Sequence, residues 1–262
     1  MNTDSAWRCI EPSIAAARES LPEPLDALAA AAVPAIVIRG ALSADSCEQI
    51  VRQLIDEGLL YDPQLPVADR FLASAIPEGY FREGVQPTTG VPPIDGTPDR
   101  RRIDVGTSLG YRGSDQEDFF AHSESTHRLF ERLYAVGPNP IALIYDHLQA
   151  LSPARRVVTA YEPDGRRYGP AIFRAHYGAY TYKPHFDSVR LREKRSNYAV
   201  YQFEHQFAGV LVLQNSRQGD RVPHTILHRC LWEPDIDRHL QNDTFADYAR
   251  DHATEQVEVR LE

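Results

Sequence analysis

The sequence has few cysteines and no long apolar run. Its three cysteines are Cys9, Cys47 and Cys230, which are far apart and form no CxxC pair. This odd, scattered set supports neither a disulfide framework nor a cysteine zinc site, and it predicts a reducing, cytoplasmic location. No segment approaches the roughly 18 uncharged apolar residues of a membrane span, so we expect neither a span nor a signal peptide.

Basic residues are also fewer than acidic residues. The chain has 28 Lys and Arg residues against 37 Asp and Glu residues, a formal net charge of −9. Such a charge opposes binding to phosphate backbones and to anionic lipid surfaces. We therefore expect a small-molecule partner rather than a nucleic acid or a membrane, and the sequence leaves the oligomeric state open.

The length and composition predict a folded domain. Of the 262 residues, 42% are hydrophobic and 10% are aromatic, which is enough to form a core. This length is ordinary for one barrel-type domain. Residues 1–32 are rich in Ala, Pro and acidic side chains and are predicted to be an N-terminal extension, with residues 33–262 as a single domain.

Helices dominate the first part of that domain. Residues 35–40 resemble a buried strand, and Ser43 is a suitable N-cap for an amphipathic helix that ends before Gly58. Two further helices are predicted near residues 116–136 and 140–151. The intervening residues 61–113, dense in Pro, Gly and charge, are expected to form a long loop region.

The second part has strand patterns instead. Five short strands are predicted, and a helix-like stretch at 235–253 is followed by strand-like alternation from Gln256. Helices followed by strands indicate an α+β fold with helices on one side of an antiparallel sheet or sandwich. The five predicted strands are 157–160, 171–176, 197–203, 207–213 and 225–231.

One pair of side chains has the residue types and the spacing of a metal site. His185 and Asp187 are two residues apart, so on an extended chain both point to the same face. An imidazole and a carboxylate side by side are two thirds of the facial triad that holds Fe(II). The alternative is a surface ion pair at a strand end. A second match, at His122 and Glu124, falls in a predicted helix and is interpreted as a solvated face.

The sequence around this pair resembles a known family. Residues 161–165, 168–171 and Arg174 are similar to the Fe(II) and 2-oxoglutarate dependent oxygenases, in the branch of freestanding indole-alkaloid halogenases and N-substituted amino acid hydroxylases. Residues 35–58 and 207–215 resemble other parts of that family's domain. The resemblance implies a double-stranded β-helix, or cupin-like jelly roll, with flanking helices.

The resemblance also implies an activity and a site. The expected reaction is hydroxylation of an aliphatic C–H bond of an amino acid derivative or specialised metabolite, with Fe(II), 2-oxoglutarate and O₂. His185 and Asp187 are the implied metal ligands and catalytic residues. The halogenases carry a small residue in place of the carboxylate, so Asp187 disfavours halogenation. Arg174 and Tyr180 are expected in the 2-oxoglutarate pocket, although Arg174 is equally well explained as a strand arginine paired with an acidic neighbour.

The third iron ligand of the family is missing from its expected place. In the family it is a histidine on a late strand, followed by an arginine that anchors 2-oxoglutarate. In this sequence it would be expected from about Val257 onward. No histidine lies beyond His252, which remains a weak match in a polar helical stretch. The prediction is that the last one or two strands are missing from the chain, which an open reading frame continuing past Glu262 would support and a natural stop there would contradict.

Two other classes of function stay open. The first is a cupin-like protein that binds a small acid or a metal without turnover. The second is a serine hydrolase, because residues 106–110 match GxSxG around Ser108, although Gly113 follows too soon for a long helix.

Five aromatic residues are expected to line the pocket of the oxygenase: Tyr177, Tyr180, Tyr182, Phe203 and Phe207.

Overall fold

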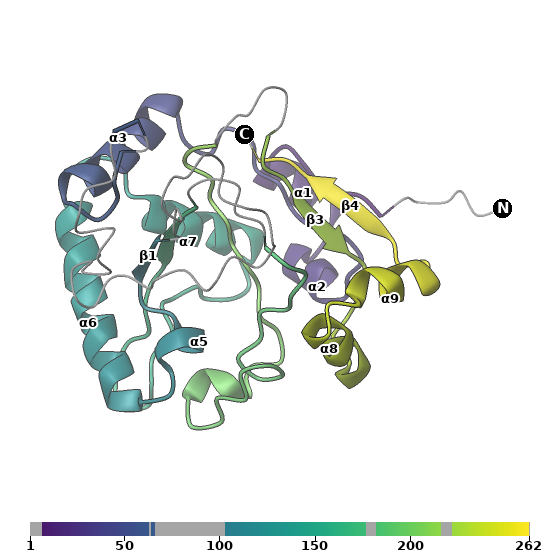
Figure 1. Cartoon of the computed structure of the whole chain (residues 1–262). Helices are drawn as coiled ribbons and strands as arrows, with labels where there is room; N and C mark the ends of the chain where they lie inside the picture. Colours follow the sequence, from purple (N-terminus) through teal and green to yellow (C-terminus); the bar gives the residue numbers. More distant parts are fainter. Residues whose placement is uncertain (1–6, 63, 66–102, 177–181, 216–221, 262) are drawn as a thin grey trace.

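Two small antiparallel sheets organise the chain (Figure 1). Strand β1 (Ile103–Gly106) pairs with β2 (Ile172–Ala175), and β3 (Thr225–His228) pairs with β4 (Gln256–Val259). In the described residues these strands form no closed barrel, so the jelly-roll core stays a prediction. The computed structural model describes residues 7–62, 64–65, 103–176, 182–215 and 222–261.

Helix α3 (Ala44–Asp56) confirms the first predicted helix. The Ser43 side chain accepts a hydrogen bond from the backbone N–H of Ser46 at 3.2 Å, which satisfies one of the free donors at the helix start. Ile50 and Leu54, one turn apart, are both buried. The local sequence thus determines both where the helix begins and which side it buries.

The next two predicted helices are also confirmed. Helix α6 (Gln116–Leu133) begins after Asp115, whose carboxylate accepts from the N–H of Asp118 at 2.9 Å. Helix α7 (Pro140–Leu151) has its proline at the first helical position, where a missing N–H costs nothing. No helix in the part of the chain that the structure describes is long and apolar enough to cross a membrane.

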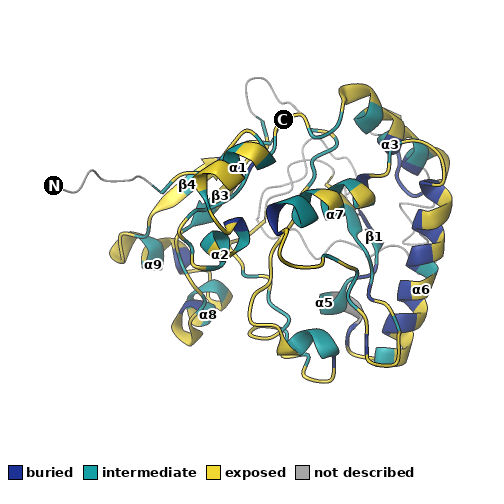
Figure 2. Ribbon diagram, turned by 180° about the vertical axis from the view of Figure 1, so that it is seen from behind, coloured by how far each residue is buried: buried dark blue, intermediate teal, exposed yellow. Residues whose placement is uncertain are grey.

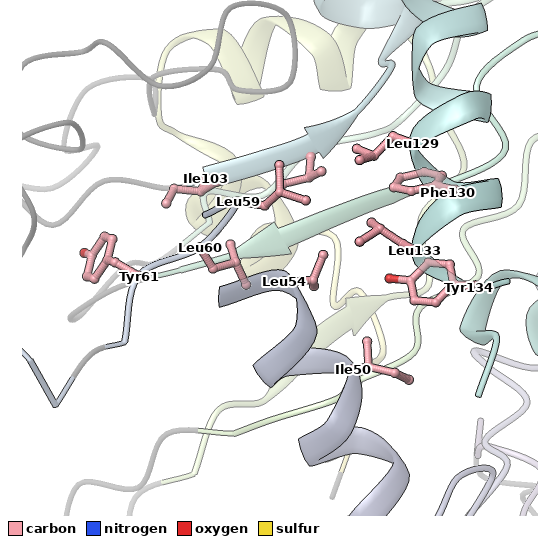
Figure 3. Close-up of a cluster of buried hydrophobic side chains, with 11 residues drawn as sticks. Ile50, Leu54, Leu59, Leu60, Tyr61, Ile103, Leu129, Phe130, Leu133 and Tyr134 are labelled. Carbon is pink, nitrogen blue, oxygen red and sulfur yellow. The ribbon is translucent and has the colours of Figure 1, made fainter. Parts of the chain in front are cut away.

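The main hydrophobic core lies between α3, α6 and the first sheet (Figure 3). Side chains from α3 meet those of α6, while Ile103 and Val105 project from β1 into the same cluster. The backbone of β1 is thereby fixed against α6. The buried members of this core are Ile50, Leu54, Leu59, Leu60, Tyr61, Ile103, Val105, Leu129, Phe130, Leu133 and Tyr134.

The N-terminal residues carry two short helices, α1 (Ile14–Ser20) and α2 (Pro24–Ala29). Helix α1 packs against α7 of the domain. The predicted strand at 35–40 is reduced to a single parallel bridge between Ile36 and Ile10. The region predicted as an extension therefore contacts the elements that follow it.

Helices α8 (Pro234–Gln241) and α9 (Phe245–Asp251) accompany the second sheet. They confirm the helix-like stretch at 235–253 and divide it at a turn. Each of these helices buries a single residue, Ile236 in α8 and Phe245 in α9, whereas the inner side of α6 is buried (Figure 2). In Figure 1, α8 and α9 lie at the opposite end of the molecule from α3 and α6.

Several strand predictions differ from the structure. The predicted strands at 171–176 and 225–231 appear in shorter form as β2 and β3, and the alternation at the C-terminus appears as β4. Residues 157–160 and 207–213 form no assigned strand, and 197–203 contains the 3₁₀ turn η2 (Ala199–Gln202) instead. Strand β1 lies in the region expected to be a loop, because four residues including Asp104 and Gly106 give too weak a pattern to detect.

Candidate functional site

His185 and Asp187 lie on a segment without regular secondary structure rather than on a strand. Strand β2 ends at Ala175, and residues 182–187 belong to no helix or strand. Both side chains are exposed. The pair is therefore accessible to a ligand, but no sheet fixes its geometry.

The imidazole of His185 is oriented by the backbone. Its Nδ1 lies 2.7 Å from the carbonyl oxygen of Lys183, and since a carbonyl only accepts, Nδ1 carries the proton and donates it. In the neutral ring, Nε2 then has a free lone pair. Histidines that ligate metals commonly have this arrangement, with one nitrogen held by a carbonyl and the other available to the ion.

The carboxylate of Asp187 is open. Within the described ranges it makes no hydrogen bond or ion pair, so it does not pair with His185. The surface ion-pair alternative for these two residues is therefore not observed. An open carboxylate two residues after an imidazole of fixed tautomer supplies two donor types that Fe(II) accepts.

The structure does not assemble a third ligand with this pair. The described residues contain no group of three His, Cys, Asp or Glu side chains that could hold a metal ion. His252 lies just after α9, where its ring stacks on Tyr248 at 4.1 Å and its Nδ1 donates to the Tyr248 carbonyl at 2.9 Å. The structure therefore does not bring His252 to His185 and Asp187.

Another histidine after the pair, His228, is partly buried. It lies on β3, and its ring packs edge-on against Phe245 with centroids 5.0 Å apart. Burial lowers the pKa of His228, because removal from water disfavours the charged imidazolium. These contacts are typical of a histidine that packs in the interior.

Arg174 forms the contact that its structural alternative predicts. It lies opposite Asp104 in the β1–β2 register, and its Nε is 3.7 Å from Oδ1 of that buried carboxylate. The guanidinium remains partly exposed. Tyr177 and Tyr180 lie outside the described residues. The 2-oxoglutarate role of Arg174 and Tyr180 stays a prediction.

Of the aromatic residues expected to line a pocket, Tyr182 lies next to the pair. Its ring is 5.4 Å from that of His185, and its hydroxyl is 2.9 Å from Nε2 of His176. Phe203 and Phe207 are both exposed. A surface depression of about 440 Å³ on α3, which includes Asp45, Arg52 and Val136, contains none of the predicted site residues.

The GxSxG region has an arrangement that the sequence did not predict. Strand β1 precedes it and a single helical turn, α5 (Leu109–Arg112), follows, but no described side chain hydrogen-bonds to Ser108. The nearby histidine, His122, instead bonds Thr107 at 2.8 Å, and both are buried. The solvated position predicted for His122 is thus wrong, and Ser108 has no observed general base.

Comparisons with known proteins do not assign this chain to a family. No protein-family profile matches it, and no curated protein sequence matches it significantly. The site residues themselves are therefore the basis on which a function can be proposed.

Proposed function

We propose that this chain is a non-haem Fe(II) and 2-oxoglutarate dependent oxygenase that hydroxylates an aliphatic C–H bond of a small molecule. The observation that carries the proposal is that one ring nitrogen of His185 and the carboxylate of Asp187 are both available to a ligand. The imidazole has its Nδ1 proton directed to the Lys183 carbonyl, and the carboxylate two residues later is open. Both groups can therefore bind a cation without first breaking an existing ion pair.

The donor set fits the metal. One imidazole nitrogen and one carboxylate are two of the three groups in the facial arrangement used by Fe(II) oxygenases, which leaves positions open for a co-substrate. Bound Fe(II), with 2-oxoglutarate and O₂, supplies the oxidising power for the C–H bond. In this proposal His185 Nε2 and Asp187 hold the ion, and the described residues assign no third ligand.

Other residues supply binding and orientation. Arg174 offers a charge for a carboxylate of 2-oxoglutarate, with its guanidinium oriented by the Asp104 carboxylate beside it. Tyr182, which lies against His185, offers an apolar surface and a hydroxyl near the substrate position. Because Asp187 occupies the position where the similar halogenases have a small residue, the proposal is hydroxylation rather than halogenation. All three cysteines are free thiols, which is compatible with the cytoplasmic location that we also propose.

The experiment measures succinate released from 2-oxoglutarate in the presence of a panel of amino acid derivatives. We expect release that requires added Fe(II) and is lost in Asp187→Ala. His205→Ala is the matched control, because His205 is also exposed and follows the pair closely. Saturable binding of Fe(II) without succinate release or O₂ uptake would instead support the non-catalytic cupin-like binding protein.

A further inference from the structure

The segment that carries His185 and Asp187 is held by side chains. In the described structure no backbone-to-backbone hydrogen bond involves residues 182–187. Three side-chain contacts hold the segment instead. Tyr182 meets His176, Arg192 donates to the Phe186 carbonyl at 3.0 Å, and Lys183 contacts Asp243. The position of the pair therefore depends on side-chain contacts, one of which reaches a residue 60 positions away.

Of the three contacts, the one between Lys183 and Asp243 joins the residues that are farthest apart in the sequence. The Lys183 ammonium lies 2.8 Å from Oδ1 and 2.6 Å from Oδ2 of Asp243, so both carboxylate oxygens accept from it. Asp243 lies in the turn between α8 and α9 with φ +57°. A left-handed residue in a short turn has little backbone freedom, so the α8–α9 pair presents this carboxylate at a defined place.

Lys183 connects this carboxylate to the metal-binding imidazole. Its ammonium binds Asp243, while its carbonyl oxygen accepts the Nδ1 proton of His185. The ion pair restrains the residue whose carbonyl selects the tautomer of His185. We infer that Asp243 is a positioning residue that, through Lys183, keeps Nε2 of His185 unprotonated and directed to the metal position. The metal part of this inference rests on the proposed function.

The expected effect is modest. Both partners are partly exposed, with 43% of the Lys183 side chain and 60% of the Asp243 side chain accessible. An ion pair of this kind changes an equilibrium by at most about fivefold. We therefore expect Asp243→Asn to shift the ratio of the two His185 tautomers about fivefold toward protonated Nε2, with little change in global stability.

The test is ¹⁵N NMR of the metal-free protein at about pH 8, with the His185 signals assigned. Asp243→Asn is the main variant, because asparagine tolerates the left-handed conformation as aspartate does. Asp251→Asn is the matched control. It removes the same charge from the same pair of helices, its side chain is 64% exposed, and it pairs with Arg250 rather than with Lys183. We expect the tautomer shift in Asp243→Asn alone.

A double-mutant comparison separates contact through Lys183 from a direct effect of charge. In Lys183→Met, which keeps the backbone carbonyl, adding Asp243→Asn should change nothing further. An unshifted tautomer ratio in Asp243→Asn, an equal shift in Asp251→Asn, or an additive double variant would each overturn the inference. Co(II) titration of the same proteins tests the metal part, with about fivefold weaker binding expected for Asp243→Asn. If the unaltered protein binds no Co(II), the proposed function fails, and the NMR result still decides whether Asp243 orients His185.

Discussion

The hydroxyl of Thr107 lies 2.8 Å from Nδ1 of His122 and 2.6 Å from the hydroxyl of Thr126. All three side chains are buried. Thr107 directly follows β1, and the other two residues are one turn apart on the inner side of α6. This polar contact therefore fixes the end of β1 to α6, beside the apolar core that Ile103 and Val105 share with the same helix.

Replacing that hydroxyl tests the contact. Thr107→Val keeps the shape of the side chain but deprives two buried polar groups of a partner, which typically costs about 1–3 kcal/mol. We expect the free energy of unfolding in urea to fall by about 2 kcal/mol. Thr107→Ser retains the hydroxyl and should lose much less. Equal stability of the valine and serine variants would show that the hydroxyl contributes nothing.

The last residue of β1 tests how closely the first sheet is packed. A Cβ added at Gly106 would lie 2.5 Å from the Ala171 carbonyl oxygen, and φ there is +132°. Gly40 is the matched control, because its φ is +63° but nothing lies within 4 Å of its Cβ position. We expect Gly106→Ala to lower the free energy of unfolding by about 3 kcal/mol and Gly40→Ala by about 1 kcal/mol. Similar losses in both variants would mean that backbone conformation alone matters.

Ionisation of Tyr134 lowers the stability of the folded chain at alkaline pH. Burial raises its pKa above the ordinary value of 10, so the folded chain keeps a proton that the unfolded chain loses above that pH. Its contribution is complete below about pH 10 and is lost as the pH rises further, by about 1.4 kcal/mol per pH unit.

The variant Tyr134→Phe isolates this effect. The buried hydroxyl has no hydrogen-bond partner among the described residues, so its removal should not reduce stability at neutral pH. Urea unfolding between about pH 9 and pH 11 should show a shallower fall for the variant than for the unaltered chain. Identical slopes would mean that Tyr134 does not titrate differently in the two states.

Local patterns predicted the helices but only part of the sheets. α3, α6 and α7 follow from apolar spacing and from Ser43 and Pro140 at their starts, which are features of neighbouring residues. A strand also needs a hydrogen-bonding partner elsewhere in the chain. Ile103 pairs with Ala175, and no pattern within the four residues of β1 predicts that distant pairing.

The same distinction applies to the site. The spacing of His185 and Asp187 is local and visible in the sequence, whereas Lys183 and Asp243 are 60 residues apart and no local pattern predicts their contact. The prediction for His122 is wrong because the inner face of α6 is partly polar. An apolar pattern cannot predict burial of a side whose members include Ser123, Thr126 and His127.

The most direct test of the central claim is an anaerobic titration of the protein with Fe(II) and 2-oxoglutarate, followed by visible absorption. If His185 and Asp187 hold the ion as proposed, the charge-transfer band of the iron chelate with 2-oxoglutarate should appear and saturate, and it should be absent in Asp187→Ala. No band with the unaltered chain, or an undiminished band in Asp187→Ala, would contradict the assignment of these two residues as the iron site.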